Sequence, residues 1–276
     1  MERRIREKII GKLLFLTNGA MLGIILGLLV QNCGQRQWSV NASGLVEKTE
    51  AVTGTSASAN VINQSEKEEE NICYLTFDDG PSSNTVKILD ILKKYEAKAT
   101  FFVIGNSLTE ENREIVERMI KEGHCIGLHA NDHNYSKFYE SENSWQQDLE
   151  LLENRLEKEY GIKTRLFRFP GGSACHYMKG NVKEHIAAMH EKGMVCFDWN
   201  VSGEDSVGSP TTALIYQNVL QGALKYHTPV VLLHDSSIAD ATVEALKDIL
   251  RELSSRGYRF ETLENRKEYI FRSSRE

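Results

Sequence analysis

From Ile72 onward, short apolar runs alternate with longer segments in which apolar residues recur every three or four positions. Short apolar runs bounded by glycine or polar residues are typical of buried strands, and the longer periodicity is typical of helices. The predicted strands cover residues 72–77, 98–104, 124–128, 165–169, 194–200, 229–233 and 258–262. The predicted helices cover residues 83–96, 109–122, 143–160, 181–192, 211–226 and 240–256. This alternation predicts an α/β fold around a parallel sheet.

Seven strands separated by helices predict a distorted (β/α)7 barrel, related to the TIM barrel but one unit short. In folds of this kind the active site lies at the carboxyl ends of the strands. Five of the predicted strands end in residues that can do chemistry: Asp78-Asp79, His129, Arg168 before Pro170-Gly171-Gly172, Asp198-Trp199 and His234-Asp235. The coincidence predicts one metal-dependent active site at this end of the sheet.

The N-terminal residues follow another pattern. Residues 1–8 contain four basic and two acidic side chains, and residues 9–30 are mostly apolar, interrupted by Lys12 and Asn18. About 20 apolar residues span a bilayer, and a basic flank tends to stay in the cytoplasm. We therefore expect a cytoplasmic segment over 1–8 and a transmembrane signal anchor over 9–30. A cleaved signal peptide is the alternative, although no small-x-small cleavage site follows Val30.

Residues 31–71 are rich in Ser, Thr, Asn and Glu without apolar periodicity, which is typical of a flexible linker. They lead to a predicted catalytic domain over residues 72–276, outside the cell membrane, which we expect to act as a monomer. The net charge of −6 gives no basic footprint for nucleic acid. Cys73, Cys125 and Cys196 lie in apolar runs, which favours buried thiols, with a disulfide outside the cell as the alternative.

A candidate metal site lies just past two of the predicted strands. His129 and His133 are four positions apart, so a single turn of loop would direct both imidazoles onto one ion. Two histidines and one carboxylate make a common hydrolytic zinc site that leaves a position open for water and substrate. Asp78 and Asp79 point in different directions, so one can bind metal while the other transfers a proton. The alternative is an Asp-Gly-Pro turn with solvated carboxylates.

Residues 72–262 resemble the polysaccharide deacetylases, the carbohydrate esterase family 4 or NodB-like domain. Four motifs carry the resemblance, in the order of the family: Thr76–Pro81 (TFDDGP), His129–His133 (HANDH), Arg168–Gly172 (RFPGG) and Leu232–Asp235 (LLHD). The resemblance implies a distorted (β/α)7 barrel that removes acetyl groups from N-acetylated sugars. It also implies one divalent metal ion, usually zinc.

The resemblance implies a role for each matching residue. Asp79, His129 and His133 would bind the metal ion. Asp78 would be the general base that activates the water, and His234 would be the general acid that protonates the leaving amine.

Four further residues would assist this chemistry. The resemblance implies that Arg168 orients the general base and that the backbone N–H of Gly171 stabilises the oxyanion. Leu233 would line the pocket for the acetyl methyl group. Trp199 is a candidate wall of the substrate pocket, with a place in the core as the alternative.

Two positions depart from the family pattern. Ala130 stands where the family usually has Ser or Thr, which removes a hydroxyl group near the metal loop. Ser202 stands where many members carry an Asp that pairs with the catalytic histidine. Asp235, Glu204 and Asp205 are the candidates for that task, and the sequence leaves the choice open.

The leading functional hypothesis is a deacetylase acting on cell-wall glycan, on N-acetylglucosamine or N-acetylmuramic acid units of peptidoglycan. An O-acetyl esterase on a xylan-like glycan is the nearest alternative. A non-catalytic wall-binding module is a third hypothesis, but each directly catalytic position of the family pattern is filled. A two-metal phosphoesterase is disfavoured, because it needs more carboxylate and histidine ligands at the strand ends.

Overall fold

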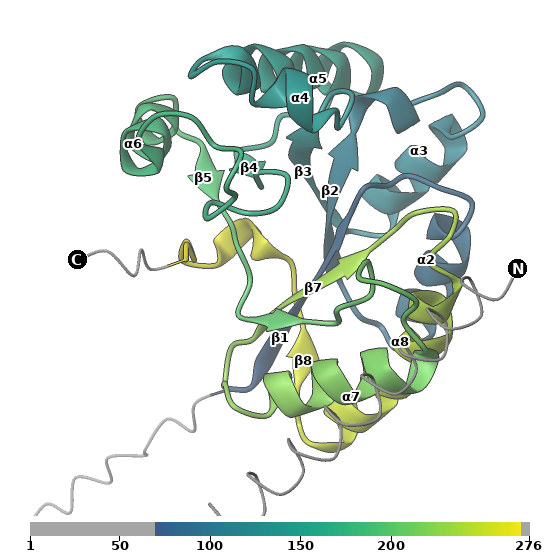
Figure 1. Ribbon diagram of the computed structural model, residues 1–276. Coiled ribbons are helices and arrows are strands. Elements are labelled where there is room, and N and C mark those ends of the chain that lie inside the picture. The colour runs from purple at the N-terminus through teal and green to yellow at the C-terminus, as the bar shows by residue number, and fades with distance from the viewer. Residues whose placement is uncertain (1–69, 272–276) are drawn as a thin grey trace, which may run out of the picture. The chain divides into compact units, whose positions relative to one another are not determined.

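The structure, a computed structural model, describes residues 70–271 (Figure 1). The predicted cytoplasmic segment and transmembrane anchor, and all but the last two residues of the predicted linker, lie outside this range. Within residues 70–271, no helix has both the length and the apolar character needed to cross a bilayer.

Strands and helices alternate along the described chain, except that two helices follow the third strand and that the fifth and sixth strands are consecutive. The strands are β1 (Ile72–Asp78), β2 (Ala99–Ile104), β3 (Cys125–Ala130), β4 (Leu166–Phe167), β5 (Val195–Cys196), β6 (Val201–Ser202), β7 (Val230–His234) and β8 (Arg259–Phe260). The helices are α2 (Thr85–Lys94), α3 (Arg113–Lys121), α4 (Tyr135–Phe138), α5 (Ser144–Tyr160), α6 (Val182–Glu191), α7 (Thr212–Ala223) and α8 (Asp240–Ser255). Each of the six predicted helices and each of the seven predicted strand regions contains the expected element, but the strand predicted over 194–200 is shortened to β5, and β6 follows after that range.

Helix α5 illustrates how the sequence pattern becomes structure. Trp145, Leu149, Leu152 and Leu156 recur at helical spacing, and all four are buried. Gly161 follows the helix with φ of 67°, a left-handed conformation that glycine adopts without steric cost and that commonly ends helices. The helix therefore begins and ends close to the predicted bounds, 143–160.

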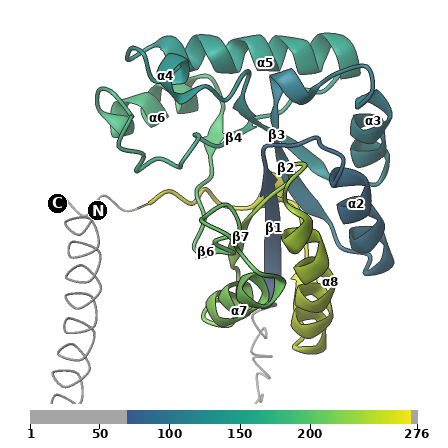
Figure 2. The same ribbon diagram turned by 45° about the vertical axis from the view of Figure 1, so that its right-hand side comes forward.

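The strands form one parallel sheet in the order β5-β4-β3-β2-β1-β7-β6, and β8 pairs with the beginning of β1. The sheet is curled, and helices α2, α3, α5, α7 and α8 lie around its outer side (Figure 2). Strand β1 is central, so Asp78 at its end lies opposite Phe102 of β2 and His234 of β7. This register brings the ends of β1 and β7 together.

The predicted barrel takes the form of an open, curled sheet. Strands β5 and β6 are consecutive in sequence but lie at the two ends of the strand order, and no described pairing joins them. The last described residues occupy part of this opening: Phe197 bridges to Tyr269, and the Phe271 N–H donates to Asp198 Oδ2 at 2.7 Å. Because the segment after β5 pairs with the C-terminal residues, it does not continue into β6.

The alternation of side chains along β1 separates core from site. Leu75 and Phe77 point to the outer side and join the main hydrophobic core under the helices. Thr76 and Asp78 point inward, as alternate residues of a strand must. Asp78 is therefore both buried and directed toward the inner end of the curled sheet.

The cysteines of residues 70–271 are free thiols: Cys73, Cys125, Cys175 and Cys196. Cys73 and Cys196 are fully buried, and Cys125 is half-buried. The interpretation as buried, unpaired thiols is therefore confirmed for Cys73 and Cys196, whereas Cys125 is a free thiol that is only half-buried.

Candidate active site

A cavity of about 360 Å³ opens at the carboxyl ends of the strands. Its walls come from β1, β3, β6 and β7, from the first residue of α4, and from the loops that follow β1, β3, β4, β5 and β6. The lining residues are Asp78, Asp79, His129, His133, Tyr135, Gly171, Trp199, Ser202, Glu204, Ser206, Val207, Leu232 and His234. Most of the predicted site residues therefore lie in one cavity, and Arg168 and Leu233 do not line it.

Three side chains in this cavity could hold a metal ion. Asp79 Oδ1 lies 3.5 Å from His129 Nε2 and 3.4 Å from His133 Nε2, and the ligand atoms all lie within 4.8 Å of one another. Asp79 Oδ1 is buried and has no hydrogen-bond partner in the described chain. One oxygen and two imidazole nitrogens around an unpartnered carboxylate atom fit a divalent cation.

The protonation of these groups favours the same interpretation. Burial lowers the pKa of His129 and of His133, so both rings are in the neutral form that binds metals. His129 Nδ1 lies 2.9 Å from the carbonyl oxygen of Arg168. A carbonyl only accepts, so Nδ1 carries the hydrogen and the lone pair of Nε2 faces Asp79. Burial raises the pKa of Asp79 because it destabilises the charged form of the carboxyl group. A bound cation would stabilise that charged form.

The backbone at this cluster is strained. Asp79 has φ of 76° and His133 has φ of 54°, both in the left-handed region that residues other than glycine rarely adopt. Such conformations cost of order 1–3 kcal/mol each and gather at functional sites. Here they occur in two of the three residues that could hold the ion.

Arg168 lies behind the cavity, fully buried at the end of β4. Its Nη1 donates to Asp78 Oδ1 at 2.8 Å and to Thr76 Oγ1 at 2.7 Å, and its Nε donates to the Phe197 carbonyl at 2.7 Å. A buried charge is tolerated when it is paired and hydrogen-bonded in this way. The predicted contact between Arg168 and Asp78 is confirmed, and it leaves Asp78 Oδ2 3.8 Å from His129 Nε2.

His234 lies across the cavity and is held by Asp205. His234 Nδ1 lies 2.8 Å from Asp205 Oδ1, and the His234 backbone N–H donates to Asp205 Oδ2 at 2.8 Å. Thr242 Oγ1 donates to the same Oδ2 at 2.8 Å. Burial lowers the pKa of His234, but the hydrogen bond and charge of Asp205 outweigh it and, with Asp78 and Asp79, raise the pKa to about 9.

These contacts decide among the three acids that the sequence leaves open. Asp205 is the carboxylate that faces the imidazole of His234. Asp235 is fully buried and accepts hydrogen bonds from Ser82 Oγ at 2.8 Å and Thr85 Oγ1 at 2.5 Å. It therefore fixes the loop after β1 and has no described contact with the ring of His234.

The prediction that Leu233 lines the pocket is wrong. Leu233 is fully buried on the outer side of β7, where its Cδ2 would lie 2.7 Å from a Cβ on Gly203. Leu232 lines the cavity instead. Because successive residues of a strand face opposite sides, Leu232 and His234 share the inner side and Leu233 cannot.

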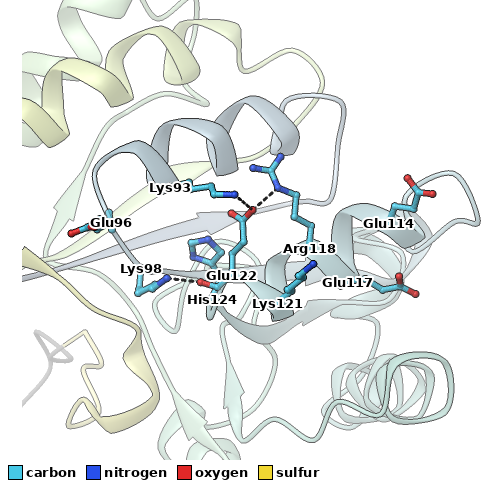
Figure 3. A pocket seen from close by; sticks show the side chains of 10 residues that line it. Lys93, Glu96, Lys98, Glu114, Glu117, Arg118, Lys121, Glu122 and His124 are labelled. Atoms are coloured by element: carbon cyan, nitrogen blue, oxygen red, sulfur yellow. Dashed lines mark hydrogen bonds and ion pairs between the residues drawn. The ribbon is translucent and has the colours of Figure 1, made fainter.

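A larger groove, of about 950 Å³, lies between α2 and α3, near the amino ends of β2 and β3 (Figure 3). Arg118 Nε pairs with Glu122 Oε1 at 2.8 Å, and Lys98 Nζ donates to the Glu122 carbonyl at 2.5 Å. Burial, and then the charge of Lys98, lower the pKa of His124 to about 4. Opposite charges neutralise one another here, and within residues 70–271 the cluster that could hold a metal ion is at the smaller cavity.

Comparisons with known proteins agree with this geometry. Residues 65–190 match the family described as polysaccharide deacetylase. The peptidoglycan-N-acetylglucosamine deacetylase of Bacillus cereus is 36% identical over 201 residues, covering 70% of this chain and 69% of that protein. The bifunctional xylanase/deacetylase of Pseudobutyrivibrio xylanivorans is 31% identical over 212 residues, covering 76% of this chain but 32% of that protein.

A solved structure shows the same fold. The catalytic domain of the peptidoglycan N-acetylglucosamine deacetylase from Eubacterium rectale superposes with a TM-score of 0.68 at 33% identity, over 73% of this chain and 93% of that chain. The chain belongs to the polysaccharide deacetylase family. Membership indicates a deacetylase, which is a hydrolase, and confirms the resemblance drawn from the four sequence motifs.

Proposed function

We propose that the protein is a metal-dependent N-deacetylase acting on peptidoglycan, at its N-acetylglucosamine or N-acetylmuramic acid units. The observation that carries the proposal is the buried, unpartnered Asp79 Oδ1, which faces two neutral histidines. An Asp78–Arg168 pair and a His234–Asp205 pair lie around that cluster. The similar peptidoglycan deacetylases support the choice of glycan.

Asp79, His129 and His133 would hold one divalent metal ion, and their one oxygen and two nitrogen atoms suit zinc. When bound, such an ion acts as a Lewis acid toward the acetyl carbonyl and makes a water molecule easier to deprotonate.

Asp78 is the proposed general base. Arg168 occupies its Oδ1 and balances its charge, so Oδ2 is left facing the cavity to accept the proton of the attacking water. The oxygen of that water forms the new bond to the acetyl carbon. The N–H of Gly171 has no hydrogen-bond partner in the described chain and would donate to the oxyanion that develops there.

His234 is the proposed general acid. Asp205 accepts the Nδ1 hydrogen, which leaves Nε2 to deliver a proton to the sugar nitrogen as the C–N bond breaks. With a pKa of about 9, the ring is protonated at neutral pH. Acetate and the free amine leave, and Trp199 forms part of the wall that would receive the sugar.

A second candidate is O-acetyl ester hydrolysis on a xylan-like glycan. The similarity to a bifunctional xylanase/deacetylase favours this alternative, since an ester would place the same carbonyl between the same base and acid. A wall-binding module without activity is disfavoured, because it needs neither the Asp78–Arg168 pair nor the His234–Asp205 pair.

Acetate release by the full-length protein tests the proposal. We expect release from N-acetylated peptidoglycan, loss of release on chelation, and recovery on adding zinc. Acetylated xylan is the matched substrate, and an Asp78→Asn variant controls for contaminating activity. Faster release from xylan would favour the esterase, and no release from either polymer would contradict both enzymes.

We also propose that residues 9–30 anchor the chain in the cell membrane and that the catalytic domain is extracellular. The basic segment over 1–8 and the apolar run after it support this topology. Mass spectrometry of the protein from membranes should find the original N-terminal residues. A chain that begins after Val30 would identify the segment as a cleaved signal peptide.

A further inference from the structure

Tyr135 brings an aromatic hydroxyl group to the wall of the cavity. It is the first residue of α4, two positions after His133, and Asn134 starts this short helix by accepting a hydrogen bond from the Lys137 N–H. The Tyr135 ring packs edge-on against His133 at 5.3 Å and against Tyr177 at 5.6 Å between centroids. Ring contacts therefore fix its position.

The hydroxyl group of Tyr135 has no hydrogen bond to any residue of the described chain. Other tyrosines close to the core are satisfied: Tyr139 donates to the Pro170 carbonyl at 2.7 Å, and Tyr258 donates to the Tyr226 carbonyl at 2.8 Å. Tyr135 is half-buried, and polar groups at such positions are normally paired with protein, water or ligand. The hydroxyl of this cavity-lining residue is thus a donor available to a molecule in the cavity.

Gly171 lies beside this hydroxyl. A Cβ atom on Gly171 would lie 3.2 Å from Tyr135 Oη, so the two groups share one wall of the cavity. The backbone N–H of Gly171 also has no partner within residues 70–271. Asp78 and Asp79, which are acceptors, line the cavity as well. Two unpartnered donors near one position suit an oxygen atom that gains negative charge.

We propose that Tyr135 donates a hydrogen bond to the acetyl oxygen while that oxygen carries the negative charge of the tetrahedral intermediate. The inference rests on the proposed deacetylation. When the water oxygen bonds to the acetyl carbon, the carbonyl electron pair moves to the acetyl oxygen, and Tyr135 and Gly171 stabilise it as donors. When the C–N bond breaks, that pair re-forms the carbonyl, His234 protonates the nitrogen, and Tyr135 keeps its hydrogen throughout.

This role predicts a particular kinetic signature. A donor that acts on developing charge contributes more in the transition state than in the ground state, so its loss lowers kcat and leaves KM nearly unchanged. A donor that binds a hydroxyl group of the sugar would contribute equally in both states, and its loss would raise KM instead.

Tyr135→Phe in the full-length protein is the test, because it removes the hydroxyl group and keeps the ring contacts. We expect kcat on N-acetylated peptidoglycan fragments to fall about 10- to 100-fold. Loss of a single oxyanion donor typically costs about 10²-fold or more, so this is at or below the lower end of that effect. KM should change less than about twofold. The matched control is Tyr177→Phe, which makes the same change on the neighbouring ring, 51% exposed, and should leave both constants unchanged.

Two further measurements separate the role from a structural defect. The zinc content of Tyr135→Phe should equal that of the wild type. A phosphonamidate analogue of the N-acetyl group, which carries a tetrahedral charged centre, should bind Tyr135→Phe more weakly by the same factor by which kcat/KM falls.

The inference is overturned if Tyr135→Phe raises KM at constant kcat, leaves both constants unchanged, or binds the analogue as tightly as the wild type. In those cases the wild type still releases acetate, so the proposed deacetylase function stands. A wild-type protein that releases no acetate would instead overturn the proposed function, and the role of Tyr135 with it.

Discussion

Charged side chains are paired with one another at one end of the curled sheet, whereas at the other end a carboxylate is left without such a partner. In the groove between α2 and α3, near the amino ends of β2 and β3, cations and carboxylates pair: Arg118 pairs with Glu122 at 2.8 Å and with Asp90 at 2.7 Å. In the cavity at the carboxyl ends, Asp79 faces two histidines whose pKa burial lowers, so neither supplies a positive charge. Two cations lie nearby, and each is already bonded to another carboxylate: Arg168 to Asp78, and the protonated His234 to Asp205.

The difference shows that the volume of a cavity does not by itself identify the active site. The groove is the larger of the two, yet its ion pairs neutralise one another. At the cavity, a carboxylate and two neutral imidazoles converge with no ion pair of their own, and the backbone is strained at Asp79 and His133. A fold maintains such an arrangement when a ligand compensates for it. Substitutions at the two ends should therefore differ in kind.

The largest effect is expected from Asp78→Asn. The variant keeps the shape of the side chain but removes the proposed base, so kcat should fall about 10²- to 10⁴-fold. The zinc content should stay at the wild-type level, because Asp78 is not among the proposed ligands. Glu122→Gln in the groove is the control and should leave kcat unchanged. Loss of zinc from Asp78→Asn would reverse the roles assigned to Asp78 and Asp79.

The next effect concerns metal affinity. Asp79→Asn replaces the carboxylate whose Oδ1 is unpartnered, and zinc affinity should fall about 10- to 100-fold or more. Excess zinc should restore part of the activity, as measured by titrating zinc into the metal-free variant and following kcat. Full retention of zinc at wild-type affinity would show that the three-residue cluster is not the metal site.

A smaller effect is expected in the pH profile. A general acid must be protonated, so kcat/KM should fall as the pH rises through the pKa of His234, which is raised to about 9. Asp205→Asn removes the carboxylate that raises this pKa, and burial then lowers it. The basic limb should move to lower pH by about one unit, which lowers kcat/KM about threefold at pH 8.5 and about tenfold well above pH 9, relative to wild type. An unmoved limb would exclude this role for the pair.

The smallest effect is expected in the groove, and on stability. Burial, with a contribution from Lys98, lowers the pKa of His124 to about 4 from its ordinary value of 6.5. Between these values the unfolded chain binds the proton and the folded chain does not. The contribution of His124 to the free energy of unfolding is therefore fully present above pH 6.5 and is lost as the pH falls toward 4. The loss is no more than about 1.4 kcal/mol per pH unit.

His124→Gln should remove this dependence. The free energy of unfolding, measured in urea at pH 7 and at pH 5, should fall between these pH values by about 1 kcal/mol more in the wild type than in His124→Gln, after allowance for partial exposure. The kcat of the variant should match the wild type, because the groove lies at the other end of the strands. A loss of activity in His124→Gln at full stability would break the contrast between the two ends.

The sequence predicts the groups that follow strands directly. Asp78, His129 and His234 each end an apolar run, and parallel strands bring their carboxyl ends to one edge, so their convergence follows from local pattern and topology. The contact of Arg168 with Asp78 was expected from the resemblance to the family. These predictions depend on short stretches of sequence whose direction the strand fixes.

Other features depend on contacts between distant segments. The choice of Asp205 requires the loop after β6 to meet β7 and α8, through His234 and Thr242. The choice between Leu232 and Leu233 depends on the phase of a strand that is apolar on both sides, where no alternation of polarity marks the inner face. Tyr135 lies in a helix of four residues, too short to show periodicity.

The position of β1 in the middle of the sheet has a consequence for synthesis of the chain. Its neighbour β7 is made far later: Thr76 Oγ1 bonds to the Val231 carbonyl across 155 positions. Until that segment leaves the ribosome, one edge of β1 is unpaired, and unpaired edges of apolar strands favour association with other chains. A chain halted before β7 already contains Asp79, His129 and His133, but its central strand still lacks the partner that would carry His234.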